Sequence, residues 1–517
     1  MAKKTNKYWD ERALRRLSDA EKIGDEYIKR VKSIYNKAFK DIDKEIASVY
    51  RNYSKDTGLD IQKLKELLTK KETDKVWKTL KRQGLDKYIK DNYKARISRL
   101  EQIQAQIYAK AKLIYPKEEL EHTMAYKGVI NDSYYKTVYD TQMGTGYDFS
   151  FSKIDKNMEK ALLTERWSGK NYSERIWGNT DILAENVSEI VGSGLLEGRS
   201  LAKMSKELKE RFKVNKYYAE RLIRTEVNHF NNEADAMAYE EMGVDMYVFV
   251  ATLDNRTSEI CQTMDGKKFP YKDKEEGVNF PPLHPNCRSK TRGYLGEEYE
   301  TTLKRRARNP ITGKTEFIDN MSYSEWLKKQ KVKYGDKAVT TSIKQTKNKT
   351  RDKTQYEKYK PYLGKDVKDF ETFQKIKYND TDKWENVKEY VSISRHGEMP
   401  NNLSFNKYYD NIKDVNWEAV DFSPLRVDKH YEKHANEFSD IDKETYINNA
   451  KKLLNSNIND TILGFANDKG FRFKYDSKNN EFATCKPSGV IETYFKPKNG
   501  KEYWEEQVKE YGNKKDV

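Results

Sequence analysis

The sequence predicts a multidomain α+β protein, and three observations lead to this fold class. The chain has 517 residues, which is more than one hydrophobic core usually organises. Apolar residues recur every three or four positions through long stretches of residues 1–200, as in amphipathic helices. Short β-branched and aromatic runs, at 247–252 and between 461 and 495, indicate strands. Because 12% of the residues are aromatic, we expect several modest cores rather than a disordered chain.

Long helices dominate the predicted N-terminal helical region, residues 1–200. The first spans about 20–52 and the second about 88–115, and Pro116 is expected to end the second helix. Both are long for globular helices, so they either pair as a coiled-coil-like hairpin or pack into a helical domain. We favour the packed domain.

A small α+β domain is predicted over residues 201–300. A helix carrying Leu222, Val227 and Ala234 ends at Gly243, and 247–252 then reads as a buried strand. A proline-rich loop, 254–288, follows the strand directly. Helix, strand and loop together form one small packed unit.

Three segments complete the predicted organisation. Residues 301–360 are expected to form a basic linker, because such a run of positive charge is usually a solvated tether. Residues 361–420 keep enough aromatic side chains for a small adaptor. Residues 421–517 predict a separate domain in which helices over 428–454 precede an antiparallel meander of three or four strands.

Charge and cysteine content narrow the class of protein. The formal net charge of +16 permits contact with nucleic acid but does not establish it. No apolar run approaches the length that crosses a membrane, and the N-terminus lacks the apolar core of a secretory signal. Three cysteines cannot build a disulfide framework, so we expect synthesis in a reducing compartment.

The proline-rich loop brings together a candidate metal site. Cys261, His284 and Cys287 are the thiol and imidazole ligands that suit a structural Zn²⁺, which takes four ligands. The candidates for the fourth ligand are His229, Asp254 and Asp265. Two alternatives remain: packed thiols beside a hydrogen-bonded histidine, or a Cys–His nucleophile pair.

The start of the same loop predicts a turn. The pattern Asp254-x-Arg256-Thr257 lets Asp254 accept backbone N–H bonds, and we expect Arg256 to pair with a carboxylate such as Glu226. This role is structural rather than catalytic.

The ordered motifs of this region resemble one known family, the Mu F-like minor head proteins of tailed bacteriophages. The resemblance rests on Arg224-Thr225-Glu226, Asp254-x-Arg256-Thr257-x3-Cys261, Asp265-Gly266 and Pro282-x-His284-Pro285-x-Cys287-Arg288. It implies a virion component inside the capsid at the portal vertex, made in the host cytoplasm, that acts in head assembly and DNA packaging or delivery. The implied partners are portal, capsid or scaffold proteins and phage DNA. Ser289 departs from the pattern, because many relatives carry another cysteine there.

The C-terminal domain carries a second candidate site. His430 and His434 are four residues apart and share one helix face, and Thr493 and Lys496 follow on the last predicted strand. Two histidines can move protons to and from the oxygens of a phosphodiester while a cation stabilises the phosphorane, which is the chemistry of metal-independent RNA cleavage. The same residues also fit a solvated helix face and an ordinary edge strand.

This domain resembles the barnase/EndoU/colicin/RelE-like nuclease domains that are appended to phage head proteins. The resemblance implies a base or acid role for His430 or His434, and phosphate contacts for Thr493 and Lys496. The sequence thus favours a phage minor head protein with a fused ribonuclease-like domain. The alternative is a toxin-type metal-independent ribonuclease carried on a capsid-binding module, and a plain nucleic-acid binder is a third reading that rests on charge alone.

Overall fold

The computed structural model describes residues 6–55, 58–90, 97–302, 304–395, 397, 399, 403–439 and 441–512. The chain forms two compact units, Met1–Gly335 and Asp336–Val517. Both combine helices with small antiparallel sheets, so the predicted α+β multidomain class is confirmed.

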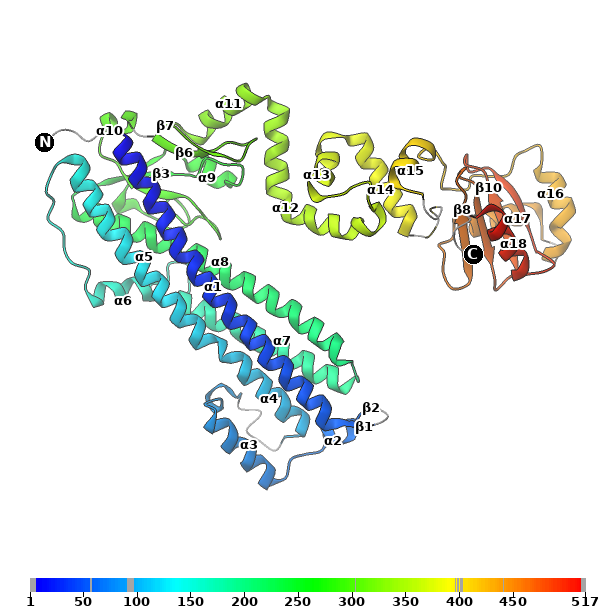
Figure 1. Ribbon diagram of the computed structural model, residues 1–517, viewed down its shortest axis with the longest axis horizontal. Helices are drawn as coiled ribbons and strands as arrows, with labels where there is room; N and C mark the ends of the chain where they lie inside the picture. The colour runs from blue at the N-terminus through cyan, green and yellow to red at the C-terminus, as the bar shows by residue number, and fades with distance from the viewer. Residues whose placement is uncertain are drawn as a thin grey trace. The chain divides into compact units, whose positions relative to one another are not determined.

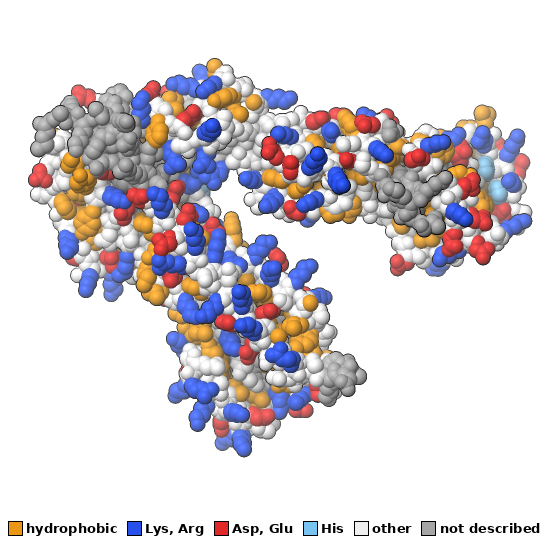
Figure 2. All heavy atoms as spheres, viewed as in Figure 1, with side chains coloured by type: hydrophobic (Ala, Val, Ile, Leu, Met, Phe, Trp, Pro, Cys, Tyr) orange, Lys and Arg blue, Asp and Glu red, His pale blue; other side chains and the backbone are white. Residues whose placement is uncertain are grey.

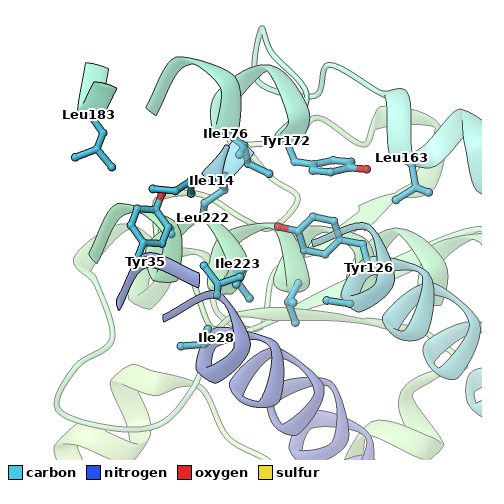
Figure 3. Packing of buried hydrophobic residues seen from close by; sticks show 14 of the residues in the cluster. Ile28, Tyr35, Ile114, Tyr126, Leu163, Tyr172, Ile176, Leu183, Leu222 and Ile223 are labelled. Atoms are coloured by element: carbon cyan, nitrogen blue, oxygen red, sulfur yellow. The ribbon is translucent and has the colours of Figure 1, made fainter. Parts of the chain in front are cut away.

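A bundle of long helices forms most of the first unit. Helices α1 (Asn6–Tyr53), α5 (Ile114–Thr145) and α8 (Leu201–Glu241) pack along one another, and α4 (Arg99–Lys112) packs on α7 (Tyr172–Leu196) (Figure 1). Their apolar faces meet in one core, where Tyr35, Tyr126, Ile176 and Ile223 converge from four helices (Figure 3). The long helices therefore belong to a packed domain rather than to a free coiled-coil hairpin.

The second predicted helix does not end at Pro116. Helix α4 ends at Lys112 and α5 begins at Ile114, so Pro116 lies in the first turn of a new helix. A proline is tolerated there because the first backbone N–H groups of a helix have no partner within it. Residues 91–96 of the predicted helix lie outside the described residues.

Two ionisable side chains are enclosed inside this bundle. The Tyr35 hydroxyl donates to Glu118 Oε2 at 2.7 Å, and the Tyr126 hydroxyl lies 2.8 Å from His122 Nδ1. Burial raises the pKa of Glu118 to about 8 and lowers the pKa of His122 to about 3. Both groups are therefore uncharged in the folded protein at neutral pH.

Short elements lie around the bundle. They are β1 (Ser54–Lys55), β2 (Gly58–Leu59), α2 (Ile61–Lys65), α3 (Lys70–Arg82), η1 (Asp86–Tyr88) and α6 (Lys156–Thr164).

A three-stranded antiparallel sheet lies against the C-terminal part of α8. The predicted strand is present as β3 (Met246–Val250), and it is central, between β4 (Lys268–Pro270) and β5 (Lys290–Gly293). At Gly293 a Cβ atom would approach the Tyr239 ring to 2.6 Å, so only glycine lets β5 pack this closely on α8. Helix α9 (Glu259–Met264), η3 (Tyr271–Asp273) and α10 (Glu297–Thr302) complete this part of the unit.

The segment that the sequence predicts as a basic linker holds folded elements instead. A hairpin of β6 (Lys304–Arg308) and β7 (Thr315–Asp319) is followed by α11 (Tyr323–Tyr334) and α12 (Asp336–Leu363). Trp326 of α11 is fully buried with Leu253 and Ala307, because the hairpin and α11 cover the end of the β3 segment. The positively charged side chains of this segment therefore lie on folded elements rather than on a flexible linker.

The second unit begins with helices and ends with a sheet. Helices α12, α13 (Phe370–Asn379), α14 (Thr381–Arg395) and α15 (Phe405–Asn411) share an aromatic core. This core includes Tyr356 of α12, so it begins before the predicted adaptor region, 361–420. Helices α16 (Val427–His434), η4 (Ala435–Phe438) and α17 (Lys443–Asn455) then precede a four-stranded antiparallel meander in the order β11-β10-β9-β8. The strands are β8 (Ile462–Ala466), β9 (Arg472–Asp476), β10 (Glu481–Cys485) and β11 (Ile491–Phe495).

The C-terminal sheet packs on both faces. Helix α17 covers one face, where Tyr446, Ala483 and Tyr494 are buried. Helix α18 (Lys501–Tyr511), which the sequence analysis missed, covers the other face with Trp504. The sheet therefore has a core on each side, and β11 forms one of its edges.

Candidate functional site

The structure brings Cys261, His284 and Cys287 together as a thiol cluster. Cys261 Sγ lies 3.8 Å from Cys287 Sγ and 3.4 Å from His284 Nε2. Both thiols are buried, each 2% exposed, and they are not joined as a disulfide. Ser258 caps α9 by accepting from the Cys261 backbone N–H, which fixes Cys261 at the start of that helix.

The hydrogen bonds of His284 leave one ring nitrogen directed at the thiols. Its Nδ1 lies 2.9 Å from the Pro285 carbonyl oxygen, which can only accept, so Nδ1 carries the proton and donates. Nε2 then carries the lone pair, and it lies 2.8 Å from Ser258 Oγ as well as 3.4 Å from Cys261 Sγ. A histidine that donates through its other ring nitrogen is the arrangement found in histidines that bind metals. A tetrahedral zinc with Zn–S of about 2.3 Å and Zn–N of about 2.0 Å places two sulfurs about 3.8 Å apart and sulfur and nitrogen about 3.6 Å apart. The cluster matches these separations.

The pKa values of the two thiols are also consistent with metal binding. The contact with Cys287 and burial raise the pKa of Cys261. The contact with Cys261, together with the His284 hydrogen bond, lowers the pKa of Cys287. A thiolate is therefore favoured at Cys287. The buried Cys261, with its raised pKa, is poorly placed to be the nucleophile of a Cys–His pair.

None of the three side chains predicted as a fourth ligand joins the thiol cluster. His229 belongs to a separate group with Glu233 and Glu276, and Asp254 and Asp265 are held by arginines. Ser289 is buried and contacts Cys261, whose pKa its hydroxyl group lowers. The serine that departs from the resembled family's pattern thus lies where a fourth ligand would be.

Two aspartates fasten the loop that carries the thiol cluster. Asp254 accepts two hydrogen bonds from Arg288, at 2.6 and 2.8 Å, and one from the Arg256 backbone N–H at 2.8 Å. Asp265 accepts from Arg305 at 2.8 and 2.9 Å and from the Ala251 backbone N–H at 2.7 Å. The predicted turn at Asp254 is therefore present, and both motif aspartates have structural roles.

Arg256 pairs with a carboxylate as expected, but the partner is Asp254 rather than Glu226. Arg256 Nε lies 3.7 Å from Asp254 Oδ2. Glu226 instead accepts from Trp167 Nε1 at 3.0 Å and lies 3.6 Å from Arg175 Nε. It is buried on α8 and points to the side of the helix that α7 covers, so no loop arginine reaches it.

Helix α8 fixes the other end of the loop through polar side chains. Thr225 accepts a hydrogen bond from the Asn286 backbone N–H at 3.0 Å. One turn further, Asn228 donates to the Ser289 carbonyl at 2.9 Å, and Asn232 accepts from the Thr291 backbone N–H at 2.7 Å. These contacts explain the polar face of α8. Its side chains form hydrogen bonds with backbone groups of the loop that would otherwise be buried without a partner.

In the C-terminal domain the structure also brings His430 and His434 together, and their ring centroids are 5.8 Å apart. His434 Nδ1 lies 2.8 Å from Glu437 Oε1, and Glu437 Oε2 accepts from the Lys496 backbone N–H at 2.8 Å. A carboxylate that holds one ring nitrogen orients the imidazole and sets its tautomer, as in known acid–base sites. Glu437, three residues after His434, is the residue that sequence reasoning missed, and this spacing on a helix was the available signal.

His430 is half-buried beside this pair. Its ring lies 5.8 Å from the Phe422 ring, and its Nδ1 has no hydrogen-bond partner among the described residues. Burial is the main cause that lowers the pKa of His430, and the neighbouring His434 acts in the same direction. His430 is therefore neutral at neutral pH, the state a general base requires.

The other two predicted catalytic residues lie on β11 and just beyond it. Thr493 faces Thr484 of β10 across the ladder, and no contact given by the structure joins it to the histidines. The Lys496 ammonium lies 5.3 Å from the centre of the Phe438 ring, while its backbone contacts Glu437. The structure thus links His434 and Lys496 through Glu437, whereas Thr493 of β11 has no such link.

Charged side chains are mixed over the surface. Lys and Arg are interleaved with Asp and Glu on the face shown in Figure 2, and histidine side chains are visible on the C-terminal part of the second unit. The net charge of +16 is therefore not gathered into one basic patch on this face. Among the described helices, none combines the length and apolar character needed to cross a membrane.

Comparison with known proteins gives two findings. Residues 185–292 match the family described as Phage Mu protein F like protein, and this segment contains α8, β3 and the thiol cluster. NAD(+)–arginine ADP-ribosyltransferase EFV of Enterococcus faecalis is 23% identical over 244 residues. That alignment covers 46% of this chain and 46% of the relative, so the chain spans less than half of the curated protein it matches.

Proposed function

We propose that this chain is a minor head protein of a tailed bacteriophage that acts at the portal vertex in procapsid assembly and in DNA packaging or delivery. The match of residues 185–292 to the phage Mu protein F family carries the proposal. The clamped loop supports it, because Asp254, Asp265 and α8 hold a long irregular segment in one shape. A preformed surface of this kind docks without the entropic cost of ordering a flexible loop.

The assembly role is tested by isolating procapsids and virions and counting the copies of this chain. We expect a low copy number, and we expect the intact chain to co-purify with the portal ring. Particles that assemble, package DNA and infect normally without the chain would contradict the proposal.

Within the first unit, the thiol cluster is proposed to hold one structural Zn²⁺. Cys261, His284 and Cys287 would bind the ion, and it would fix the loop rather than perform chemistry. Zinc analysis of the intact chain tests this: Cys261→Ser is expected to remove about one zinc per chain. Cys485→Ser is the matched control, because this buried thiol lies in the C-terminal sheet. An unchanged zinc content in the Cys261→Ser chain would contradict zinc binding by the thiol cluster.

The C-terminal domain is proposed to be a metal-independent ribonuclease. His430, neutral at neutral pH, takes the 2′-OH proton as the oxygen attacks phosphorus, and His434, oriented by Glu437, gives a proton to the departing 5′-oxygen. The products are a 2′,3′-cyclic phosphate and a 5′-hydroxyl. Lys496 and Thr493 would contact the phosphate, where a cation stabilises the developing charge.

Incubating the intact chain with RNA and EDTA tests this activity. The expected result is cleavage that leaves 2′,3′-cyclic phosphate ends despite the chelator. Intact RNA after prolonged incubation would contradict the ribonuclease and would leave the assembly role unaffected.

The similarity to an enzyme named as an NAD(+)–arginine ADP-ribosyltransferase gives a second candidate function. Incubation with labelled NAD⁺ and an arginine-rich acceptor separates the two activities. Transfer of label without RNA cleavage would favour the ADP-ribosyltransferase, whereas the ribonuclease proposal expects cleavage and no transfer.

A further inference from the structure

A second histidine cluster lies inside the first unit, apart from the thiol cluster. His229 and Glu233 are one turn apart on α8, so their side chains share a helix face, and Glu276 reaches them from the segment after η3. One ligand atom of each of these three residues lies within 4.8 Å of the others. We call His229, Glu233 and Glu276 the carboxylate cluster.

The walls of the carboxylate cluster are fixed by other side chains. The Trp167 ring stacks on His229 with centroids 4.9 Å apart, and its Nε1 donates to the neighbouring Glu226 at 3.0 Å. Lys274 Nζ donates to Glu233 Oε2 at 2.6 Å, so the other Glu233 oxygen remains for a further partner. The geometry around His229 is thus held in place without any bond to the imidazole itself.

The buried imidazole is the unexplained part of this arrangement. His229 is fully buried, and neither ring nitrogen makes a hydrogen bond within the described part of the chain. Glu276 Oε1 lies 3.0 Å from Nδ1, but the approach does not meet hydrogen-bond geometry. A buried polar group without a partner destabilises the folded state, so a folded protein seldom keeps one without a role.

We propose that His229, Glu233 and Glu276 bind one divalent first-row transition-metal ion. One imidazole nitrogen and two carboxylates form a donor set that Mn²⁺, Fe²⁺ and Zn²⁺ accept, and it contains no sulfur. The ion would supply the missing partner of His229 and offset the negative charge that Glu226, Glu233 and Glu276 bring to a buried site. It would also fasten the segment after η3 to α8.

The test uses the intact chain with Cys261→Ser and Cys287→Ser, which removes the thiol ligands. After metal removal, Mn²⁺ is titrated and followed by calorimetry and electron paramagnetic resonance. We expect one Mn²⁺ per chain, and we expect Glu276→Gln to weaken binding by at least about tenfold, the scale on which even outer-shell partners act. Glu275→Gln is the matched control, because this neighbouring carboxylate is exposed.

Thermal unfolding gives a second readout of metal binding, and it also shows directly whether each variant is folded. Added Mn²⁺ is expected to raise the unfolding midpoint of the double-serine chain, because a ligand that binds only the folded state stabilises it. The Glu276→Gln chain is expected to show no such rise. A double-serine chain that takes up neither Mn²⁺ nor Zn²⁺, or equal binding by the Glu276→Gln chain, would overturn the proposal.

Discussion

The histidines of the two units live in opposite environments. In the first unit His122 and His229 are fully buried inside the helical packing. In the second unit His430 and His434 lie beside the edge strand β11, and His430 is only half-buried. The first environment suits structural roles or ligand binding, whereas the second leaves His430 partly exposed to solvent. One residue type therefore serves two purposes, and the surroundings rather than the sequence spacing decide which.

The largest expected effect is on the histidines of the second unit. His434→Ala is expected to lower the rate of RNA cleavage about 10²–10⁴-fold, because a general acid is lost. The rate is measured on the intact chain with an RNA oligonucleotide. Glu432→Ala, an exposed change on the same helix, is the control and should leave the rate unchanged. If His122→Asn lowered the cleavage rate equally, the assignment of catalysis to the second unit would be wrong, because His122 lies inside the first unit.

A smaller effect concerns the clamped loop of the first unit. Asp254→Asn leaves the Arg288 guanidinium without its charged partner, and breaking a buried pair costs about 3–5 kcal/mol. Arg288 is 27% exposed, so we expect the lower end of this range. Urea unfolding followed by tryptophan fluorescence measures the loss, with Glu275→Gln as control. A stability equal to that of the parent would show that the loop does not depend on the clamp.

The pH dependence of stability sharpens the contrast for buried groups. Burial raises the folded-state pKa of Glu118 from 4.5 to about 8, so its stabilising contribution is present below 4.5 and is lost as the pH rises to about 8. His122, lowered from 6.5 to about 3, contributes no slope above 6.5. Between pH 6.5 and 8, Glu118→Gln is therefore expected to remove a decline of about 2 kcal/mol.

The measurement is the free energy of unfolding at several pH values for parent and Glu118→Gln chains. Only the difference between the two curves is informative, because other buried carboxylates also titrate. Parallel curves would show that Glu118 ionises normally in the folded protein.

The smallest expected effect is at Ser289. Ser289→Cys adds a thiol beside Cys261 and completes a four-ligand set, so zinc affinity is expected to rise about tenfold or more. Competition with a chromogenic chelator measures the affinity, and Ser289→Ala serves as the matched change without a ligand. A cysteine that binds zinc no better than alanine would place the fourth position elsewhere.

Local patterns predicted much of this molecule correctly. The strand after Gly243, the C-terminal meander and the meeting of Cys261, His284 and Cys287 follow from alternation, turn residues and ligand types. The packing of the hairpin and α11 was not visible, because a basic composition does not reveal that Trp326 is buried against Leu253. Partners distant in sequence, such as Arg288 for Asp254 and Glu276 for His229, depend on tertiary structure.

Helix α8 runs unbroken for 41 residues and contains neither proline nor glycine. Such a helix is about 60 Å long and has none of the residues at which helices commonly kink. Its N-terminal half is part of the bundle, and its C-terminal half holds the loop through Thr225, Asn228 and Asn232. A force applied to the far end of the bundle would therefore tilt the whole helix and move the loop that carries the thiol cluster.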